Sequence, residues 1–241
     1  MTSSTRRGLG LAAGLVLGWL GSWALLLPTT LDQLPLALVG GAVVLRTLLQ
    51  TGLFIVAHDA MHSTLWPDRP QANRRIGQLA LVLYAALPYG RCRRNHHLHH
   101  RHAGTSRDPD HHPDGQPALW PWYGRFMAAY LSPGQLTALV LSWLVLAALG
   151  SRVSASPVLN VLAYGALPTL LSSLQLFVVG TYLPHRGPGG ALCHEPRSLA
   201  WPCWLSLLSC YHFGYHWEHH AYPHLAWHQL PAARRPAPVR A

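Results

Sequence analysis

Histidine is concentrated in three short clusters whose spacing suits metal binding. The chain has 17 histidines among 241 residues, and the clusters read HDAMH (58–62), HHLHH (96–100) and HWEHH (216–220). Residues three or four apart share one face of an α-helix, so each cluster can direct two or three imidazoles toward one point. Eight histidines are placed in this way: His58, His62, His96, His99, His100, His216, His219 and His220.

Eight directed imidazoles are more than one metal ion can use. A zinc ion is saturated by three or four protein ligands, so the set predicts at least two ions. Two iron ions, with higher coordination numbers and open positions for O2, fit this ligand set better than two closed tetrahedral zinc sites, although zinc stays an alternative. We expect a ninth ligand at His185, which directly follows the last apolar segment in TYLPHR (181–186).

Carboxylates are scarce, with only eight Asp and Glu in the chain, so their positions are informative. A metal-bound imidazole usually donates its other N–H to a carboxylate or carbonyl, which fixes the orientation of the ring. This role is predicted for four carboxylates and one histidine: Asp59, Asp108, Asp110, Glu218 and His212. Solvated acids paired with arginines are an equal alternative for Asp108 and Asp110. No ligand role is predicted for His97, His102, His111, His112, His194, His224 and His228.

Four apolar segments, 9–27, 34–57, 136–150 and 158–183, are predicted to cross a membrane as helices. The first of them is longer than the apolar core of a signal peptide, so we interpret it as a retained span. Two shorter apolar stretches, 76–89 and 199–213, are predicted to lie at the membrane interface. The fold class is therefore an all-α integral membrane protein with a histidine-rich cap. It forms a single domain over residues 1–241, with a disordered tail at about 232–241.

The arginines predict the orientation of these spans. All 18 basic residues are arginine, and 16 of them fall on the side of the clusters and both termini. Cytoplasmic loops collect basic residues, so the termini and the clusters are predicted to be cytoplasmic, with Arg152 in an outer loop. Arg46 lies within a span and is predicted to face the helix bundle, because charge in lipid is costly. The net charge of +10 accompanies no nucleic-acid motif, so no nucleic-acid partner is predicted.

Four stretches of the chain resemble one known family: FIVAHDAMH (54–62), RNHHLHHRHAGTSRDPD (94–110), GTYLPHR (180–186) and HFGYHWEHHAYPHLAWHQLP (212–231). They are similar to the membrane fatty-acid desaturase and hydroxylase superfamily, and most closely to the bacterial β-carotene ketolases. The resemblance implies a non-haem di-iron enzyme of the bacterial cytoplasmic membrane that uses O2. Such an enzyme oxidises C4 and C4′ of carotenoid β-ionone rings, converting β-carotene through echinenone to canthaxanthin and serving astaxanthin synthesis.

The resemblance also implies that the clustered histidines bind iron and that His185 matches the family's additional histidine. Electrons would come from a donor such as ferredoxin with its reductase, and the carotenoid would be drawn from membrane lipid. Ring 3-hydroxylation and acyl-lipid desaturation share the fold and metals and remain alternatives. A histidine-rich membrane metal carrier is an alternative of another class, but it should hold ligands along its spans, and the predicted spans contain no His, Asp or Glu.

Overall fold

Four long apolar helical segments dominate the structure, a computed structural model that describes residues 1–112, 118–186 and 195–234. They are α1 (Ser3–Leu26), α2 (Leu36–Met61), α6 (Pro133–Gly150) and a continuous segment, Pro157–His185. Much of their apolar surface faces outward; Leu141, Leu144 and Val145 of α6 are all more than half exposed. A stripe of exposed aliphatic side chains on a long helix is typical of contact with lipid. The chain is therefore a multi-pass membrane protein, as the sequence predicts.

The fourth span is not a uniform α-helix. It runs through α7 (Pro157–Val161), the π-helical η2 (Leu162–Ala166), α8 (Leu167–Phe177), the π-helical η3 (Val178–Tyr182) and α9 (Leu183–His185). Each π-helical stretch ends two residues before a proline, Pro168 or Pro184. Proline cannot donate to the carbonyl four residues earlier, and a widened turn accommodates that loss without ending the helix. The span therefore continues past both prolines and carries His185 to its end.

Arg46 is completely buried and joins three of the spans, which confirms the prediction that it faces the helix bundle. Its Nε donates to the carbonyl of Tyr164 at 2.8 Å, and this carbonyl is the one that Pro168 leaves without a helical donor. Its Nη1 donates to the carbonyl of Trp19 at 3.0 Å and to the hydroxyl of Ser22 at 2.8 Å. The guanidinium therefore satisfies acceptors of α1 and η2 that lipid could not satisfy.

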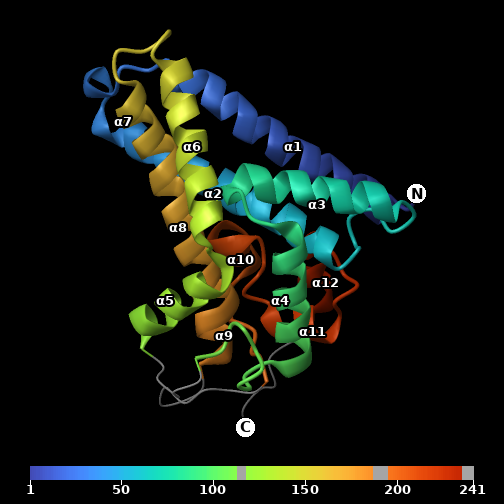
Figure 1. Cartoon of the computed structure of the whole chain (residues 1–241). Coiled ribbons are helices and arrows are strands. Elements are labelled where there is room, and N and C mark those ends of the chain that lie inside the picture. Colours follow the sequence, from blue (N-terminus) through green and yellow to red (C-terminus); the bar gives the residue numbers. More distant parts are fainter. Residues whose placement is uncertain (113–117, 187–194, 235–241) are drawn as a thin grey trace.

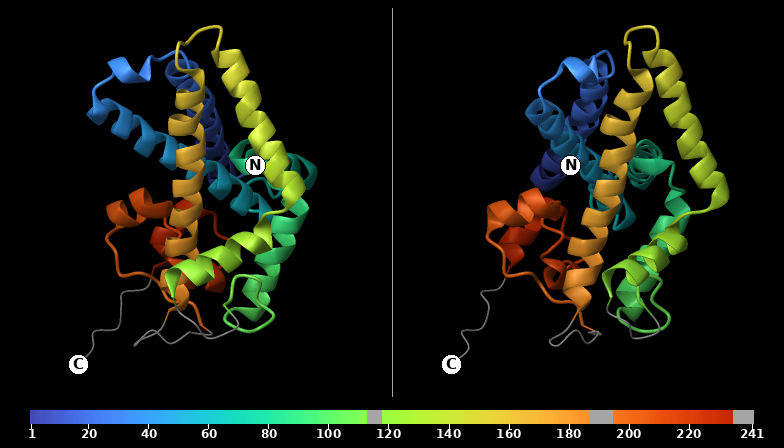
Figure 2. Two further views of the ribbon diagram at one scale, coloured as in Figure 1. Left: turned by 60° about the vertical axis from the view of Figure 1, so that its left-hand side comes forward. Right: turned by 90° about the vertical axis from the view of Figure 1, so that its left-hand side faces the viewer.

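The two turns between spans and the histidine-bearing cap lie at opposite ends of the molecule (Figures 1 and 2). The turn between α1 and α2, which contains η1 (Leu31–Gln33), lies at one end with the α6–α7 turn. At the other end, α4 (Tyr89–His102) and α9 meet four shorter elements to form a cap: α10 (Cys203–Cys210), α11 (His216–Ala221), η5 (Trp227–Gln229) and α12 (Leu230–Ala233). Between the two, α3 (Pro70–Ala85) packs across α2.

The shorter helices differ from the sequence prediction in detail. The stretch 76–89 is not one element, because Ala86 adopts a left-handed conformation (φ 53°) that ends α3 before α4 begins. Within 199–213 only Cys203–Cys210 is helical. Helix α5 (Leu119–Tyr130) was not predicted, and α2 runs to Met61, so it includes His58. Of the tail expected to be disordered, 232–233 belong to α12, and 235–241 lie outside the described residues.

Candidate metal centre

Four helices deliver nine imidazoles to one place in the cap. Helix α2 supplies His58 and His62 at its C-terminal end, where Ser63 (φ 62°) turns the chain away. Helix α4 presents three histidines spaced as one helix face, α11 presents three more, and α9 ends on the ninth. These seven are His96, His99, His100, His185, His216, His219 and His220. Every histidine that the sequence predicts as a ligand is therefore found in this cluster.

Eight of the nine imidazoles divide into two groups of four. The first group consists of His58, His62, His96 and His219, and the second group consists of His99, His185, His216 and His220. Within each group, one ring nitrogen of every histidine lies within 4.8 Å of those of the others. Both groups draw on α4 and α11, while α2 contributes only to the first and α9 only to the second. The arrangement offers two adjacent positions for metal ions.

The distances between ring nitrogens fit shared metal ligation. In the first group, Nε2 of His62 lies 2.6 Å from Nε2 of His96. In the second, Nε2 of His216 lies 3.1 Å from Nε2 of both His185 and His220. Two nitrogens bound at right angles to one ion, each by a bond of about 2.1 Å, are themselves about 3 Å apart. Neutral imidazoles whose Nε2 atoms converge in this way could hold a shared metal ion, and two iron ions fit this donor set.

His100 lies between the two groups. Its Nε2 is 3.1 Å from Nε2 of His96 and 2.8 Å from Nε2 of His219, both in the first group. Its ring also stacks on that of His220 in the second group, with centroids 4.1 Å apart and planes inclined by 15°. These contacts give the first group a fifth imidazole and place the two metal positions next to each other.

Burial keeps most of these rings neutral, as metal ligation requires. Burial, reinforced by the neighbouring imidazoles, holds the pKa of His96, His216 and His219 well below the usual value. Burial lowers the pKa of His62 to about 4. Nε2 of His58 is buried and has no hydrogen-bond partner among the described residues, so a lone pair there is available to a metal ion.

His99 is held differently, by a carboxylate on the loop after α4. Burial alone would lower its pKa, but the hydrogen bond to Asp108 and the charge of Asp110 raise it overall. Nδ1 of His99 lies 3.0 Å from both carboxylate oxygens of Asp108. The backbone N–H groups of Gly104 and Asp110 donate to the same carboxylate at 3.0 and 2.9 Å. Asp108 therefore orients His99, with Nε2 turned toward His216 and His220 of the same group.

Helix α5 supports this loop through two contacts that the sequence analysis missed. The phenol of Tyr130 donates to the carboxylate of Asp110 at 2.8 Å, and the indole N–H of Trp122 donates to the carbonyl of Asp110 at 2.7 Å. The carboxylate of Asp110 itself lies 3.9 Å from Nδ1 of His99. Burial raises the pKa of Asp110 to about 6. The only available signal for this link was the unassigned aromatic stretch LWPWYGRFMAAY.

The other predicted supports occupy varied positions. A carboxylate oxygen of Asp59 lies 3.9 Å from Nδ1 of His58 and accepts from the backbone N–H of Trp227 at 3.3 Å. Glu218 accepts a hydrogen bond from the hydroxyl of Ser198. His212 stacks on the rings of Tyr215 and Trp227, away from the nine imidazoles. Of the histidines without a predicted ligand role, His97 lies at the edge of the cluster, with its ring centroid 5.7 Å from that of His62, and His194 is outside the described residues.

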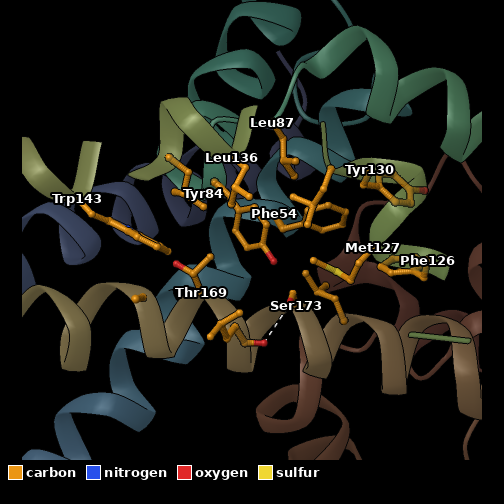
Figure 3. A pocket seen from close by; sticks show the side chains of 16 residues that line it. Phe54, Tyr84, Leu87, Phe126, Met127, Tyr130, Leu136, Trp143, Thr169 and Ser173 are labelled. Carbon is orange, nitrogen blue, oxygen red and sulfur yellow. Dashed lines mark hydrogen bonds between the residues drawn. The ribbon is translucent and has the colours of Figure 1, made fainter. Parts of the chain in front are cut away.

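An apolar cavity of about 250 Å³ adjoins the cap between α2, α5, α6 and α8. Its walls are aliphatic and aromatic, and Figure 3 shows Phe54, Met127, Trp143 and Thr169 around the opening. The cavity is close to the imidazoles along two routes. Phe54 lies one helical turn before His58 on α2, and Tyr130 in its wall donates to Asp110. The cavity can therefore hold an apolar group beside the candidate metal centre.

Comparison with known proteins agrees with this architecture. A family model described as fatty acid desaturase matches residues 33–239, so the chain belongs to that family. The β-carotene ketolase of Paracoccus sp. (strain PC1) is 42% identical over 97% of this chain and 95% of its own length. The β-carotene 4-ketolase 3 of Haematococcus lacustris is 39% identical over 87% of this chain and 71% of its own. A β-carotene ketolase of another Paracoccus strain is 43% identical over 78% of this chain and 76% of its own. The predicted fold class and the resemblance to ketolases are confirmed.

Proposed function

We propose that this chain is a di-iron membrane oxygenase that introduces keto groups at C4 and C4′ of carotenoid β-ionone rings. The observation that carries the proposal is the pair of imidazole groups, in a chain 42% identical over nearly its full length to a β-carotene ketolase. When bound, iron supplies the O2 chemistry needed to break an unactivated C–H bond, which acid and base side chains cannot do. The first group with His100, and the second group, would each hold one ion.

The chemistry of the substrate follows by repetition. A first hydroxylation at C4 consumes one O2, two electrons and two protons and releases one water. A second hydroxylation on the same carbon has the same balance and gives a geminal diol. Loss of water from the diol leaves the ketone. The protein's own residues hold the ring at the centre, keep the ligands neutral and exclude water.

The apolar cavity is the proposed site of the ring. Its volume of about 250 Å³ is below the roughly 300–1,000 Å³ of pockets that enclose whole drug-sized ligands, so it suits one end of a long hydrocarbon. The rest of an extended carotenoid would remain in lipid beside α6. The hydroxyls in the cavity wall are already bonded, Thr169 to the carbonyl of Gly165 and Ser173 to that of Leu170. An unsubstituted hydrocarbon ring therefore leaves none of these groups unsatisfied.

The proposed location is a bacterial cytoplasmic membrane, with both termini and the cap in the cytoplasm. The structure places both short turns between spans opposite the cap, and 16 of the 18 arginines fall on the cap side in the predicted topology. A reporter fused to the C-terminus should be active in the cytoplasm. Reporter activity on the opposite, non-cytoplasmic side of the membrane would contradict this orientation.

Product analysis tests the proposed activity. In a bacterial host that accumulates β-carotene, expression of the chain under air should yield echinenone and canthaxanthin, and none should form without O2. Zeaxanthin as the main product would instead indicate ring 3-hydroxylation. A purified protein that contains zinc alone, or that binds iron without O2-dependent turnover, would favour a metal-binding membrane protein over an oxygenase.

A further inference from the structure

A second hollow lies on another side of the histidines and has the opposite character to the apolar cavity. It is an open cleft of about 750 Å³ between the N-terminal half of α3 and the outer face of α4. Four exposed arginines line it, and the structure records no ion pair for any of them within the described residues: Arg74, Arg93, Arg94 and Arg101. We call this hollow the basic cleft. None of its described lining residues is acidic.

The basic cleft reaches the candidate metal centre through a short series of contacts. Nε of Arg93 donates to the carbonyl of Met61 at 3.3 Å, beside His62. His97 in the cleft wall has its ring centroid 5.7 Å from that of His62, whose Nε2 lies 2.6 Å from Nε2 of His96. One ring contact therefore separates the cleft from the first group. The helix that presents ligands on one face presents the cleft on the adjacent face.

We propose that the basic cleft is the docking site of an acidic one-electron carrier protein, which delivers electrons to the first group. This rests on the proposed oxygenase function, because each hydroxylation takes four electrons into O2. Two come from the C–H bond, and two must come from outside. A one-electron carrier therefore docks twice for each hydroxylation and four times for each ketone. Unpaired arginines attract a carrier of opposite charge and orient it, and Leu98, 39% exposed among them, supplies an apolar contact.

The length of the cleft favours a protein over a lipid headgroup as its occupant. Arg93 and Arg101 are eight residues apart on α4, about 12 Å along the helix axis. Helix α4 runs alongside the last part of the fourth span, away from the turns opposite the cap, so its end with Arg101 lies farther from the membrane centre than Arg93 (Figure 1). A layer of anionic headgroups would reach only the near end. A folded acidic protein can contact both ends together.

The test uses the iron-loaded protein in detergent with two reductants. One is a plant-type [2Fe–2S] ferredoxin of net negative charge, kept reduced by its reductase and NADPH, and the other is sodium dithionite, which needs no docking site. The test variant is Arg94→Glu with Arg101→Glu. The matched control is Arg125→Glu with Arg152→Glu, which changes the net charge equally at two exposed arginines outside the cleft. The dithionite rate reports whether the centre is intact in each variant.

In the test variant, the ratio of ferredoxin-driven to dithionite-driven turnover should fall about tenfold at low ionic strength, and KM for ferredoxin should lose most of its salt dependence. The control should keep the wild-type ratio. An unchanged ratio in the test variant, or an equal fall in the control, would overturn the proposal. So would unchanged ferredoxin kinetics together with lost binding to vesicles containing anionic lipid, which would identify a lipid surface.

Binding measured without turnover separates this proposal from the proposed function. Oxidised ferredoxin titrated into the detergent-solubilised protein should bind the wild type and control, and bind the test variant about tenfold more weakly. If the wild type forms no ketone with either reductant, the proposed function fails, and this titration still decides whether the cleft docks an acidic protein. Equal affinities for all three proteins would exclude the docking site, whatever the activity.

Discussion

The apolar cavity and the basic cleft lie beside the same imidazoles and differ in almost every chemical respect. Aliphatic and aromatic side chains line the cavity, and its hydroxyls are bonded within the protein. Four arginines that form no ion pair within the described part of the chain line the cleft. Removal of water favours the binding of a hydrocarbon ring, but it costs free energy at a charged protein surface. A hydrocarbon ring and a charged protein therefore cannot share one entrance. Under the two proposals above, substrate and electrons would reach the centre by separate sides of the cap.

Loss of a ligand from the candidate metal centre, which lies beside both the cavity and the cleft, should have the largest effect on ketone formation. Alanine at His62, His99 or His219 should reduce ketone formation to an undetectable level, because each substitution vacates a ligand position in one of the two groups. The protein should still insert, since the spans do not depend on the imidazoles. Pigment analysis of the β-carotene-accumulating host and iron content of the purified protein measure the two consequences.

His228→Ala is the matched control, because this ring packs on Trp227 outside both groups. It should keep most of the activity. Substantial ketone formation by a variant carrying both His62→Ala and His219→Ala would show that these histidines are not essential metal ligands. The cavity and the cleft would then not share a metal centre.

Asp108→Asn should have the next largest effect on metal binding and activity. An amide in place of the carboxylate keeps the size of the side chain but weakens the hold on Nδ1 of His99. Loss of such a support typically costs about 10- to 100-fold in metal affinity or activity. The measurement is iron retained during dialysis against a chelator, compared with Asp32→Asn in the turn opposite the cap. Equal retention in the two variants would show that Asp108 does not act through the metal centre.

Filling the apolar cavity should reduce turnover without affecting electron delivery at the basic cleft. Thr169→Phe places a larger side chain in the cavity and should reduce turnover by about tenfold or more, because misplacing the ring disturbs its approach to the centre. Thr169→Val is the control, since it keeps the volume and removes only a hydroxyl that bonds its own helix. The loss should be the same with ferredoxin and dithionite, unlike that of the cleft variant. A loss confined to ferredoxin would contradict separate entrances.

Arg46→Leu should have the smallest effect on turnover. It should instead lower the stability of the helix bundle. It leaves the carbonyl of Tyr164 without its buried donor, whereas the carbonyl of Trp19 still accepts from the hydroxyl of Ser22. An unsatisfied buried carbonyl costs about 1–3 kcal/mol. The detergent-solubilised variant should unfold at a lower temperature, while turnover per bound iron stays near the wild-type value. An unchanged unfolding temperature would show that the guanidinium does not hold the spans together.

The sequence by itself predicted the parts of this protein that depend on local pattern. The four spans follow from runs of apolar residues, and the nine cluster histidines follow from helical spacing and the position of His185. The burial of Arg46 follows from the cost of charge in lipid. These inferences succeeded because one helix, or one length of membrane, sets the geometry of each.

How those parts work together depends on packing between helices that lie far apart in the chain. His96 and His99 lie on the same face of α4 and both have partners on α11, but they belong to different groups, because α2 supplies the other ligands of the first group and α9 completes the second. The support from Tyr130 to Asp110 and the walls of the cavity join helices far apart in the chain. No hydrophobic periodicity or sequence motif encodes contacts between helices that lie so far apart in the chain. Packing the spans against the cap brings them together, and that packing divides nine imidazoles into two groups with an apolar hollow and a basic one beside them.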